Sequence, residues 1–308
     1  LIMLETNQSE IEISIVSPVY MSASTINILV DSIAKACNSI GKKYEIILVD
    51  DDSKDKSWNE IKKCCLENKF IKGIKLSRNF GQHIAINAGL KQAKGNWIVV
   101  LDCDMQDNPQ EIPTLYFKAI EGYSIVRARR TNRQDNLAKK ISSIFFYKVF
   151  EYLTGVSQDS SIANFGIYHR NVIEALKKMN DKHPYFPSQI NWVGFSKYDI
   201  NVKHCKSMNR KSTYNLRKLF SLALNNILSF SDKPLKIAVY IGFIISVSSF
   251  LLSVLNIIMA LLGVFSVSGF ASIIITLFFS TGVIVFVVGV VGLYIGKIFE
   301  SSKERPLY

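Results

Sequence analysis

The sequence predicts an α/β domain built on a parallel, doubly wound sheet and followed by two transmembrane helices. Short apolar segments rich in Ile and Val alternate with segments of helical periodicity over the first hundred residues, and this alternation is typical of parallel α/β sheets. The C-terminal part is almost wholly apolar, because no Asp, Glu, Lys or Arg occurs between Lys236 and Lys297. Polar side chains follow several predicted strands, which indicates a binding site at the carboxyl edge of the sheet.

The predicted elements follow one another at short intervals. The first strand is expected to end in a turn at Pro18, and the third helix is expected to end at Gly95. Apolar positions four or three residues apart support the first helix. The segments predicted as strands are 11–20, 44–53, 71–77 and 96–104, and those predicted as helices are 26–40, 56–68 and 81–95.

Two apolar runs near the C-terminus are long enough to cross a bilayer, Ile237–Leu262 and Ile273–Ile295. Each exceeds the roughly 20 residues that span about 30 Å of hydrocarbon. The alternative is an apolar soluble core, but soluble helices usually keep a polar face. Lys233 and Lys236 precede the first run and Lys297 follows the second, while the linker carries no charge. The positive-inside rule therefore places both outer ends in the cytoplasm.

The composition favours a membrane partner over a nucleic acid. The net charge is +12, which suits a surface near anionic lipid headgroups, and no aromatic-studded basic motif or zinc spacing is present. Five cysteines without a C-x-x-C pair are typical of a reduced cytosolic domain. We expect a catalytic domain over 1–209, an amphipathic juxtamembrane segment over 210–235, and a two-span region with a short tail over 236–308.

The run LDCDMQD places Asp102, Asp104 and Asp107 within six residues, directly after an apolar strand. An Asp-x-Asp pair alone is common by chance. At the end of a strand facing a pocket, however, two carboxylates need a cation, and Mg²⁺ or Mn²⁺ prefers few carboxylates plus a phosphate. A nucleotide diphosphate would complete that coordination, and the metal would stabilise it as a leaving group. The sequence contains neither a P-loop nor a G-x-G-x-x-G motif.

Several segments together resemble the family 2 glycosyltransferases of the GT-A fold. They are SIVSPVY, EIILVDDDSKDKS, LSRNFGQHIAINAGL, WIVVLDCDMQDNPQEIP and GLYIGKIFESSKERPLY. The resemblance extends from about Ile13 to Tyr308 and is strongest to polyprenyl-phosphate glycosyltransferases. It implies a GT-A (Rossmann-like) cytoplasmic domain followed by two transmembrane helices, in a multi-pass protein of the bacterial inner membrane. It also implies an inverting transfer of a sugar from a nucleotide-sugar, with UDP-hexose as the default donor, to undecaprenyl phosphate for cell-envelope glycans.

The resemblance assigns roles to particular residues. Those implied to bind the nucleotide-sugar are Pro18, Tyr20, Asp50, Asp51, Asp102 and Gln106. The metal, Mg²⁺ or Mn²⁺, is implied at Asp102 and Asp104, and the catalytic residues are Asp104 and Asp159. The lipid phosphate is implied at Arg130, Arg133, Lys139 and Lys140. Asp107 is expected to be structural, as the cap of a helix that begins near Pro109. His83 is expected to be either a core or capping residue or a ligand.

The sequence departs from the family pattern at four places. Met21 and Ser22 replace Asn-Glu, Asp52 replaces a Gly, Gly166 replaces an Arg, and Arg210 replaces a Gly. These departures concern donor recognition and phosphate contacts more than the reaction.

Two other functions compete with this one. A processive polysaccharide synthase needs a Q-x-x-R-W motif, whereas the nearest string is QINW at 189–192, and two spans are few for a conduit. An inactive sugar-nucleotide sensor or scaffold is disfavoured by the intact Asp pair and favoured by the missing Arg at Gly166. A homo-oligomer is left open.

Overall fold

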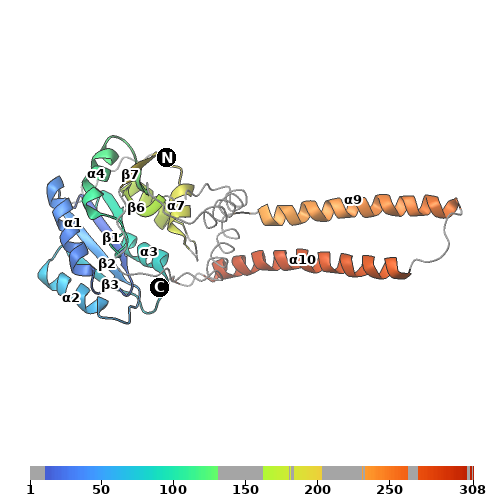
Figure 1. Cartoon of the computed structure of the whole chain (residues 1–308), viewed down its shortest axis with the longest axis horizontal. Helices are drawn as coiled ribbons and strands as arrows, with labels where there is room; N and C mark the ends of the chain where they lie inside the picture. Colours follow the sequence, from blue (N-terminus) through green and yellow to red (C-terminus); the bar gives the residue numbers. More distant parts are fainter. Residues whose placement is uncertain are drawn as a thin grey trace. The chain divides into compact units, whose positions relative to one another are not determined.

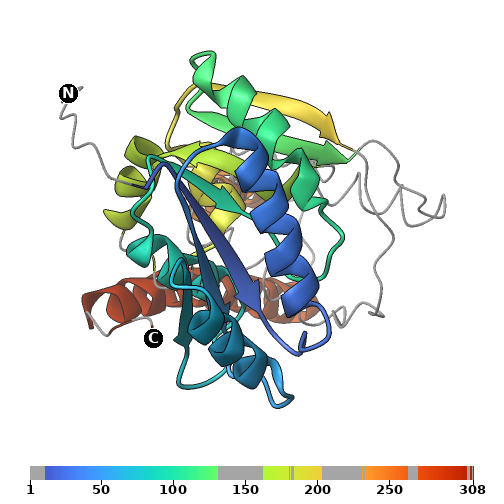
Figure 2. The ribbon, with the colours of Figure 1, turned by 90° about the vertical axis from the view of Figure 1, so that its left-hand side faces the viewer.

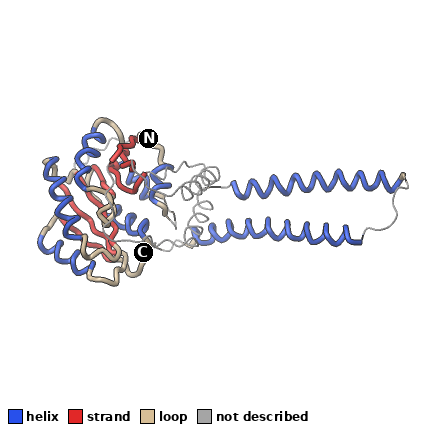
Figure 3. The backbone as a smooth tube through the Cα atoms, in the orientation of Figure 1, coloured by secondary structure: helices blue, strands red, loops and turns tan. Residues whose placement is uncertain are grey.

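The computed structural model describes residues 11–130, 162–179, 181, 184–202, 231, 233–262, 270–303, 306 and 308. The chain divides into two compact units, one that holds the sheet and one that holds the two long C-terminal helices. Figure 1 labels the elements, and Figure 3 shows the sheet in the first unit and the helix pair in the second. The domain boundaries expected from the sequence stay a prediction.

The first unit is built on a seven-stranded sheet in the order β3-β2-β1-β4-β6-β5-β7. The strands are β1 (Ile13–Val19), β2 (Tyr44–Asp50), β3 (Ile71–Lys75), β4 (Trp97–Val100), β5 (Ile125–Arg130), β6 (Ile162–His169) and β7 (Lys197–Val202). The first four are parallel, and β5 is parallel to β7, but β6 is antiparallel to both β4 and β5. The α/β prediction is confirmed. The four strands predicted from the sequence, β1–β4, are parallel as expected. The antiparallel β6 was not predicted, because an apolar strand has the same pattern whichever way it runs.

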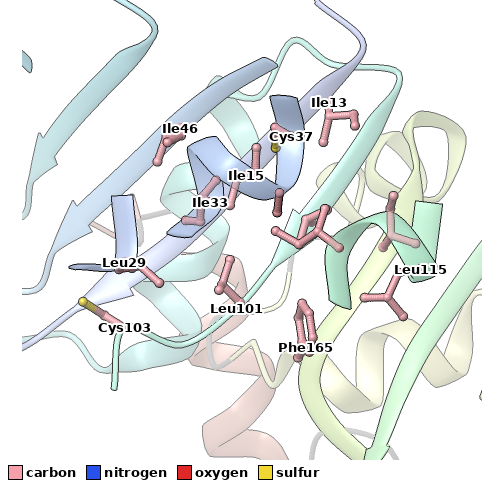
Figure 4. Packing of buried hydrophobic residues seen from close by; sticks show 14 of the residues in the cluster. Ile13, Ile15, Leu29, Ile33, Cys37, Ile46, Leu101, Cys103, Leu115 and Phe165 are labelled. Atoms are coloured by element: carbon pink, nitrogen blue, oxygen red, sulfur yellow. The ribbon is translucent and has the colours of Figure 1, made fainter. Parts of the chain in front are cut away.

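Helices cover both faces of this sheet. They are α1 (Ile26–Ile40), α2 (Ser57–Glu67), α3 (Gln82–Gln92), η1 (Pro109–Glu111), α4 (Ile112–Ile120), α6 (Arg170–Lys177) and α7 (Phe186–Trp192). Figure 2 shows α1, α2 and α4 on one face of the sheet. Their buried residues form one core cluster with alternate strand residues such as Ile15 and Val99, and Figure 4 shows part of this cluster. Buried residues of α3, α6 and α7 form a second cluster with the intervening residues, such as Val16 and Val100. Successive strand side chains therefore point to opposite faces.

The first helix agrees with its prediction, and the third does not. α1 spans the predicted 26–40 and ends at Gly41, whose φ of 71° provides the left-handed cap. α3 ends at Gln92, so the expected end at Gly95 is wrong. A Cβ at Gly95 would lie 2.5 Å from the backbone N of Ser14. This glycine therefore allows a close backbone approach rather than a helix cap.

Pro18 lies inside β1, opposite Val49, so the predicted turn at this residue is wrong. The pairing of β1 with β4 ends at Val16, whose carbonyl accepts a hydrogen bond from the N–H of Leu101 on the β4 side. Residue 18 has its backbone N on the same side as Val16, beyond the paired stretch. The next bond of this parallel ladder would run from the N–H of residue 18 to the carbonyl of Leu101. Proline has no N–H, so the pairing with β4 ends here, while β1 stays paired with β2.

The second unit contains two long helices, α9 (Lys233–Leu261) and α10 (Phe270–Ser302). They contain the predicted span Ile273–Ile295 and all of Ile237–Leu262 except its last residue. Their stretches Lys233–Leu252 and Phe279–Phe299 are long and apolar enough to cross a membrane. Many of their large apolar side chains are exposed, which is unfavourable in water. An apolar hollow of about 410 Å³ between the helices is lined by Ala238, Ile241, Phe279, Gly282, Val283, Phe286 and Val287.

Candidate active site

Polar side chains meet at one edge of the sheet. The parallel strands β1, β2 and β4 end there and are followed by Tyr20, Asp51 and Asp102. The chain moves outward from β1 to β2 on one side and returns to β4 on the other, so the gap between β1 and β4 is a topological switch point, where α/β sheets bind ligands. Because β6 reverses, β5 ends at this edge as well, and its last residue is Arg130.

Each of the three loops after β1, β2 and β4 contains a residue other than glycine with a positive φ. These residues are Met21 (52°), Asp52 (55°) and Met105 (59°). Such conformations are uncommon for side-chain-bearing residues and tend to occur at functional sites. The position of Asp52, where the family pattern has Gly, is therefore one that requires a left-handed backbone. Asp tolerates this conformation better than most residues do.

Side chains of the β2–α2 loop hold the β1–α1 loop. Three successive backbone N–H groups donate to them: Met21 to Ser53 Oγ (2.9 Å), Ser22 to Ser57 Oγ (2.9 Å) and Ala23 to Asp55 Oδ2 (3.2 Å). The sequence interpretation gave these acceptors no role. Short Ser and Asp side chains beside a helix start are common backbone acceptors, but the sequence does not show that their donors lie some thirty residues earlier.

Asp50 is fully buried at the end of β2. Its Oδ1 accepts a hydrogen bond from the N–H of Ser53 at 3.3 Å. Its Oδ2 is buried and has no hydrogen-bond partner among the described residues. A buried carboxylate oxygen of this kind is costly unless a donor reaches it, which is consistent with the predicted role of Asp50 beside a ligand.

The neighbouring carboxylate of Asp51 holds the loop before α3. Its two oxygens accept the N–H groups of Phe80 (2.8 Å) and Gly81 (2.9 Å). Burial raises the pKa of Asp51, these two hydrogen bonds oppose the rise, and the charges of Asp50 and Asp52 add to it, so the pKa lies above its usual range. The predicted contact of Asp51 with the nucleotide stays a prediction.

Each of the two predicted metal ligands accepts a hydrogen bond from another residue. Asp102 Oδ1 accepts from the side-chain Nε2 of Gln82 at 2.6 Å, and Asp104 Oδ1 accepts from the backbone N–H of Gln106 at 3.1 Å. Gln106, predicted to bind the donor, therefore lies directly beside Asp104. Gln82, the first residue of α3, is not among the predicted site residues, since no local pattern links it to a residue twenty positions later.

The carbonyl between these two aspartates is anchored to another helix. Thr25, at the start of α1, donates its hydroxyl to the carbonyl oxygen of Cys103 at 2.8 Å. Cys103 is buried, and Figure 4 shows it beside Leu29 of α1. The Asp-x-Asp loop is thus held from both faces of the sheet, by α1 and by α3.

The prediction that Asp107 caps the following helix is wrong. The cap is Asn108, whose side chain accepts the N–H of Gln110 at 3.1 Å ahead of the turn that starts at Pro109. Asp107 is only 3% exposed. It precedes the cap by one residue and lies close enough to Tyr168 for its charge to help raise the pKa of that phenol.

His83 is a packed residue beside the site. Its ring meets Tyr185 edge-on, with ring centroids 4.6 Å apart. Burial lowers the pKa of His83 to about 4, so the imidazole is neutral near pH 7 and adds no positive charge for a diphosphate. Of the two roles left open by the sequence, packing is the one these contacts support.

Gly166 is explained by packing. It lies in β6 between Val100 of β4 and Arg127 of β5. A Cβ at this position would lie 2.8 Å from the carbonyl oxygen of Val126 and 2.9 Å from the hydroxyl of Tyr168. With Tyr168 in place, no larger side chain fits, so the absent arginine reflects this strand packing.

Of the predicted acceptor residues, only Arg130 lies in the described part of the chain. Arg127 forms a two-pronged ion pair with Asp199, with N···O distances of 2.8 and 3.0 Å, and also donates to Asn191. This arginine is therefore engaged within the sheet. Arg130 ends β5 at the site edge. The predicted residues that lie outside the described part of the chain are Arg133, Lys139, Lys140, Asp159 and Arg210.

The carboxylates at this edge fit a divalent cation bound together with a phosphate ligand. Among the described residues no cluster of three or more His, Cys, Asp or Glu side chains is arranged to hold a metal ion. Mg²⁺ and Mn²⁺ bound with nucleotides need only one or two carboxylates, because phosphate and water supply the remaining oxygens. Asp102 and Asp104, which are partly exposed at the switch point, meet that requirement.

A comparison with protein families matches residues 14–217 to the model described as "Glycosyl transferase family 2". The chain belongs to glycosyl transferase family 2. It is therefore a glycosyltransferase, and the predicted family and enzyme class are confirmed.

Relatives align over nearly the whole chain. An uncharacterized glycosyltransferase, sll0501, of Synechocystis is 35% identical over 97% of this chain and 94% of its own length. The undecaprenyl-phosphate 4-deoxy-4-formamido-L-arabinose transferase of Proteus mirabilis is 32% identical over 96% of this chain and 92% of its own length. Similarity therefore includes the C-terminal helices as well as the sheet.

Solved structures support the GT-A fold. Glucosyl-3-phosphoglycerate synthase from Mycobacterium tuberculosis, in complex with Mn²⁺, UDP-glucose and phosphoglyceric acid, superposes with a TM-score of 0.52. It is 17% identical and covers 71% of this chain and 78% of its own. At this identity the likeness concerns the fold alone.

Proposed function

We propose that this glycosyltransferase moves one sugar from a nucleotide-sugar to undecaprenyl phosphate, with inversion at the anomeric carbon. The observation that carries the proposal is the Asp102–Asp104 loop at the switch point of a family 2 sheet. Full-length relatives that are named as undecaprenyl-phosphate sugar transferases support the acceptor.

Asp102 and Asp104 would hold Mg²⁺ or Mn²⁺ against the donor diphosphate. The Mycobacterium tuberculosis neighbour was solved with Mn²⁺ and UDP-glucose, which supports a divalent metal. When bound, such a metal neutralises charge that develops on the departing diphosphate. Asp50, with its orphaned Oδ2, would accept a hydrogen bond from the nucleotide, and Pro18, Tyr20 and Gln106 would line its pocket.

The acceptor accounts for the few acid–base groups that the site requires. A phosphate monoester has a second pKa near 6 and is mostly dianionic at pH 7. Its oxygen can attack the anomeric carbon without first losing a proton, so groups that orient it matter more than a strong base. Arg130 at the end of β5, with Arg133, Lys139 and Lys140, would bind this phosphate, and Asp159 would face the reacting centre.

Two donor sugars are considered for this enzyme. UDP-hexose remains our default donor, on the frequency of such donors in the family. The names of several relatives point instead to 4-deoxy-4-formamido-L-arabinose. Both donors are nucleotide-linked sugars, and the same Asp pair can serve either.

The membrane location follows from the acceptor and from α9 and α10. We propose a multi-pass protein of the bacterial cytoplasmic membrane, with the sheet on the cytoplasmic side, since lysines flank the outer ends of the two apolar stretches. A polyprenyl acceptor is itself confined to the membrane, so anchoring raises the effective concentration of the two reactants.

The proposal is tested with the full-length protein in detergent micelles that contain undecaprenyl phosphate and Mn²⁺. A panel of radiolabelled nucleotide-sugars, including UDP-glucose and UDP-4-deoxy-4-formamido-L-arabinose, is offered one at a time. We expect one donor to give a labelled lipid, with loss of label transfer in Asp104→Asn and on addition of EDTA. The anomeric configuration of the product, measured by NMR, is expected to be opposite to that of the donor.

Three outcomes would contradict the proposal. Labelled polymer in place of a single-sugar lipid favours a processive synthase. Donor binding without transfer, from every donor in the panel, favours a sensor or scaffold. Full activity of Asp104→Asn removes the proposed role of the metal site.

A further inference from the structure

Gln82 holds the Asp102 carboxylate through a short hydrogen bond. Its amide Nε2 lies 2.6 Å from Asp102 Oδ1. An ionised carboxylate can only accept, so the amide nitrogen, not its oxygen, faces it. A hydrogen bond of this length to a charged acceptor is a strong one. It fixes the rotation of the carboxylate and hence the direction in which the second oxygen of Asp102 points.

The start of α3 is in turn fixed to the end of β2. Asp51 accepts the N–H groups of Phe80 and Gly81 through its two carboxylate oxygens, and its carbonyl accepts from the side chain of Asn79 at 3.3 Å. Gly81 has a φ of 99°, a conformation open mainly to glycine. The loop therefore turns sharply at Gly81, and this turn fixes the position of the next residue, Gln82, beside Asp102.

The body of α3 adds a second constraint. A Cβ at Gly89 would lie 2.4 Å from Val16 Cγ1 and 3.1 Å from Val49 Cγ2. The helix thus lies directly on β1 and β2, and it has no room to approach or slide. Both the start and the middle of α3 are fixed relative to the strands that carry the site.

We infer that Gln82 is a positioning residue that orients Asp102 toward the metal and donor diphosphate, and that Asp51 acts through the loop that presents Gln82. This inference rests on the proposed function and deepens it. It gives the proposed metal site a supporting hydrogen bond from α3, a helix that packs on β1 and β2, whereas Asp102 itself follows β4. Partners of this kind typically change metal affinity about 10- to 100-fold when removed.

The test compares full-length wild type with Gln82→Met, which keeps the length of the side chain and removes the donor. The matched control is Gln92→Met, the same change at the exposed other end of α3. Mn²⁺ binding in the presence of UDP is measured from the EPR signal of free Mn²⁺. We expect Gln82→Met to weaken Mn²⁺ binding about 10- to 100-fold and Gln92→Met to change it less than twofold.

A second readout separates positioning from general damage. In Gln82→Met the Mn²⁺ concentration for half-maximal transfer should rise by the same factor, while the thermal melting temperature stays at that of Gln92→Met. Asp51→Asn, which turns one of its two acceptors into a donor facing a backbone N–H, should also weaken Mn²⁺ binding. Unchanged Mn²⁺ binding in Asp51→Asn would overturn the role given to the loop.

Failure of the inference can be told from failure of the proposed function. If wild type binds Mn²⁺ and Gln82→Met binds it within twofold of wild type, Gln82 has no positioning role and the proposed function stands. If wild type and Asp104→Asn are alike in binding no Mn²⁺, the metal site itself is wrong, and the inference is overturned with it.

Discussion

At the scale of single residues, two buried carboxylates in β2 have different tasks. Asp50, at the end of the strand, keeps an oxygen without a partner among the described residues. Glu45, at the beginning of the strand, is only 1% exposed and fully engaged. Its oxygens accept from the Ser14 hydroxyl (2.6 Å), the Lys72 ammonium (2.7 Å) and the backbone N–H of Lys94 (2.7 Å). Glu45, whose carboxylate already has these hydrogen-bond partners, lies at the end of β2 that is away from the site. We therefore assign it a role in stability and not in ligand binding.

Glu45→Gln is expected to lower the free energy of unfolding by about 1.5–3 kcal/mol at pH 7, the range for hydrogen bonds to charged groups. Burial raises the pKa of Glu45, but the bonds from Lys72, Ser14 and Lys94 outweigh it and leave the pKa below its usual range. A lowered pKa means that the stabilisation is present above the unfolded-state value and is lost as pH falls through the folded-state value. The difference from wild type should therefore shrink below about pH 4.

Thermal unfolding in detergent across this pH range measures the effect. Glu174→Gln is the matched control, because Glu174 is half-exposed and pairs with Lys177 only one helical turn away. An equal loss of stability in both variants would contradict the assignment of Glu45 as a buried anchor.

Asp52→Gly and Asp52→Val test the left-handed backbone after β2. With φ at 55°, glycine should be tolerated, while a β-branched side chain should cost about 1–2 kcal/mol or more. Melting temperature is the measurement, and the contrast between the two variants is the result of interest. Equal melting temperatures would show that the loop does not require this conformation. Both variants lose the surface ion pair with Lys54, so that loss cancels in the comparison.

At the scale of elements, the position of α3 depends on one glycine. Gly89→Ala is expected to destabilise the protein by about 1–3 kcal/mol, because its Cβ would overlap Val16 Cγ1. Val16→Ala removes that atom. The double variant should therefore be more stable than the sum of the two single changes predicts, with a coupling of about 0.5–3 kcal/mol. Additive effects, measured by thermal or chemical unfolding, would contradict direct contact between helix and strand.

The sequence pattern predicted most elements but not how some of them pair. The stripe of Ile26, Leu29 and Ile33 predicted α1 with its observed bounds, because helical periodicity is a local property. The reversal of β6 could not be predicted, since β6 pairs with β4, whose residues lie some seventy positions earlier. The turn predicted at Pro18 is wrong for the same reason, because β1 stays paired with β2 through Val19, and pairing is not local.

The same distinction applies to the site. Asp102 and Asp104 could be found because a strand end followed by two acids is visible in the sequence. Gln82 could not, because its contact with Asp102 depends on the turn at Gly81 and on the seat of α3 against the sheet. The turn is capped by Asn108, one position after the predicted Asp107. Asn and Asp are both favoured as caps, so propensity alone cannot decide which of two neighbouring residues takes this position.

At the scale of the whole molecule, two units of different surface chemistry share one chain. The sheet unit buries its apolar residues between layers, whereas α9 and α10 expose large apolar side chains along their length. A bilayer accounts for the exposed apolar side chains of α9 and α10, because such side chains are favourable among lipid tails and unfavourable in water.

Val288→Lys tests this environment. Val288 is 63% exposed and lies in the middle of the apolar stretch Phe279–Phe299. A lysine at the centre of a transmembrane helix costs about 2.5–3.5 kcal/mol on insertion scales, so the fraction of protein in carbonate-washed membranes should fall. Ser302→Lys, at the end of α10 and next to Lys303, is the control and should be retained. Equal retention of both would argue against a spanning α10.

The reversed strand β6 also bears on how such an enzyme can diversify. The proposed donor groups come from chain segments before residue 107, and the proposed acceptor groups begin at the end of β5. Only β6 is reversed, so β5 runs in the same direction as β1, β2 and β4. Arg130, the last residue of β5, therefore reaches the edge at which the donor loops lie, and it shares no loop with them. Substitutions can therefore accumulate in one set while the other stays unchanged. A chimera that joins this donor half to the acceptor half of a relative is a natural way to exchange one specificity and keep the other.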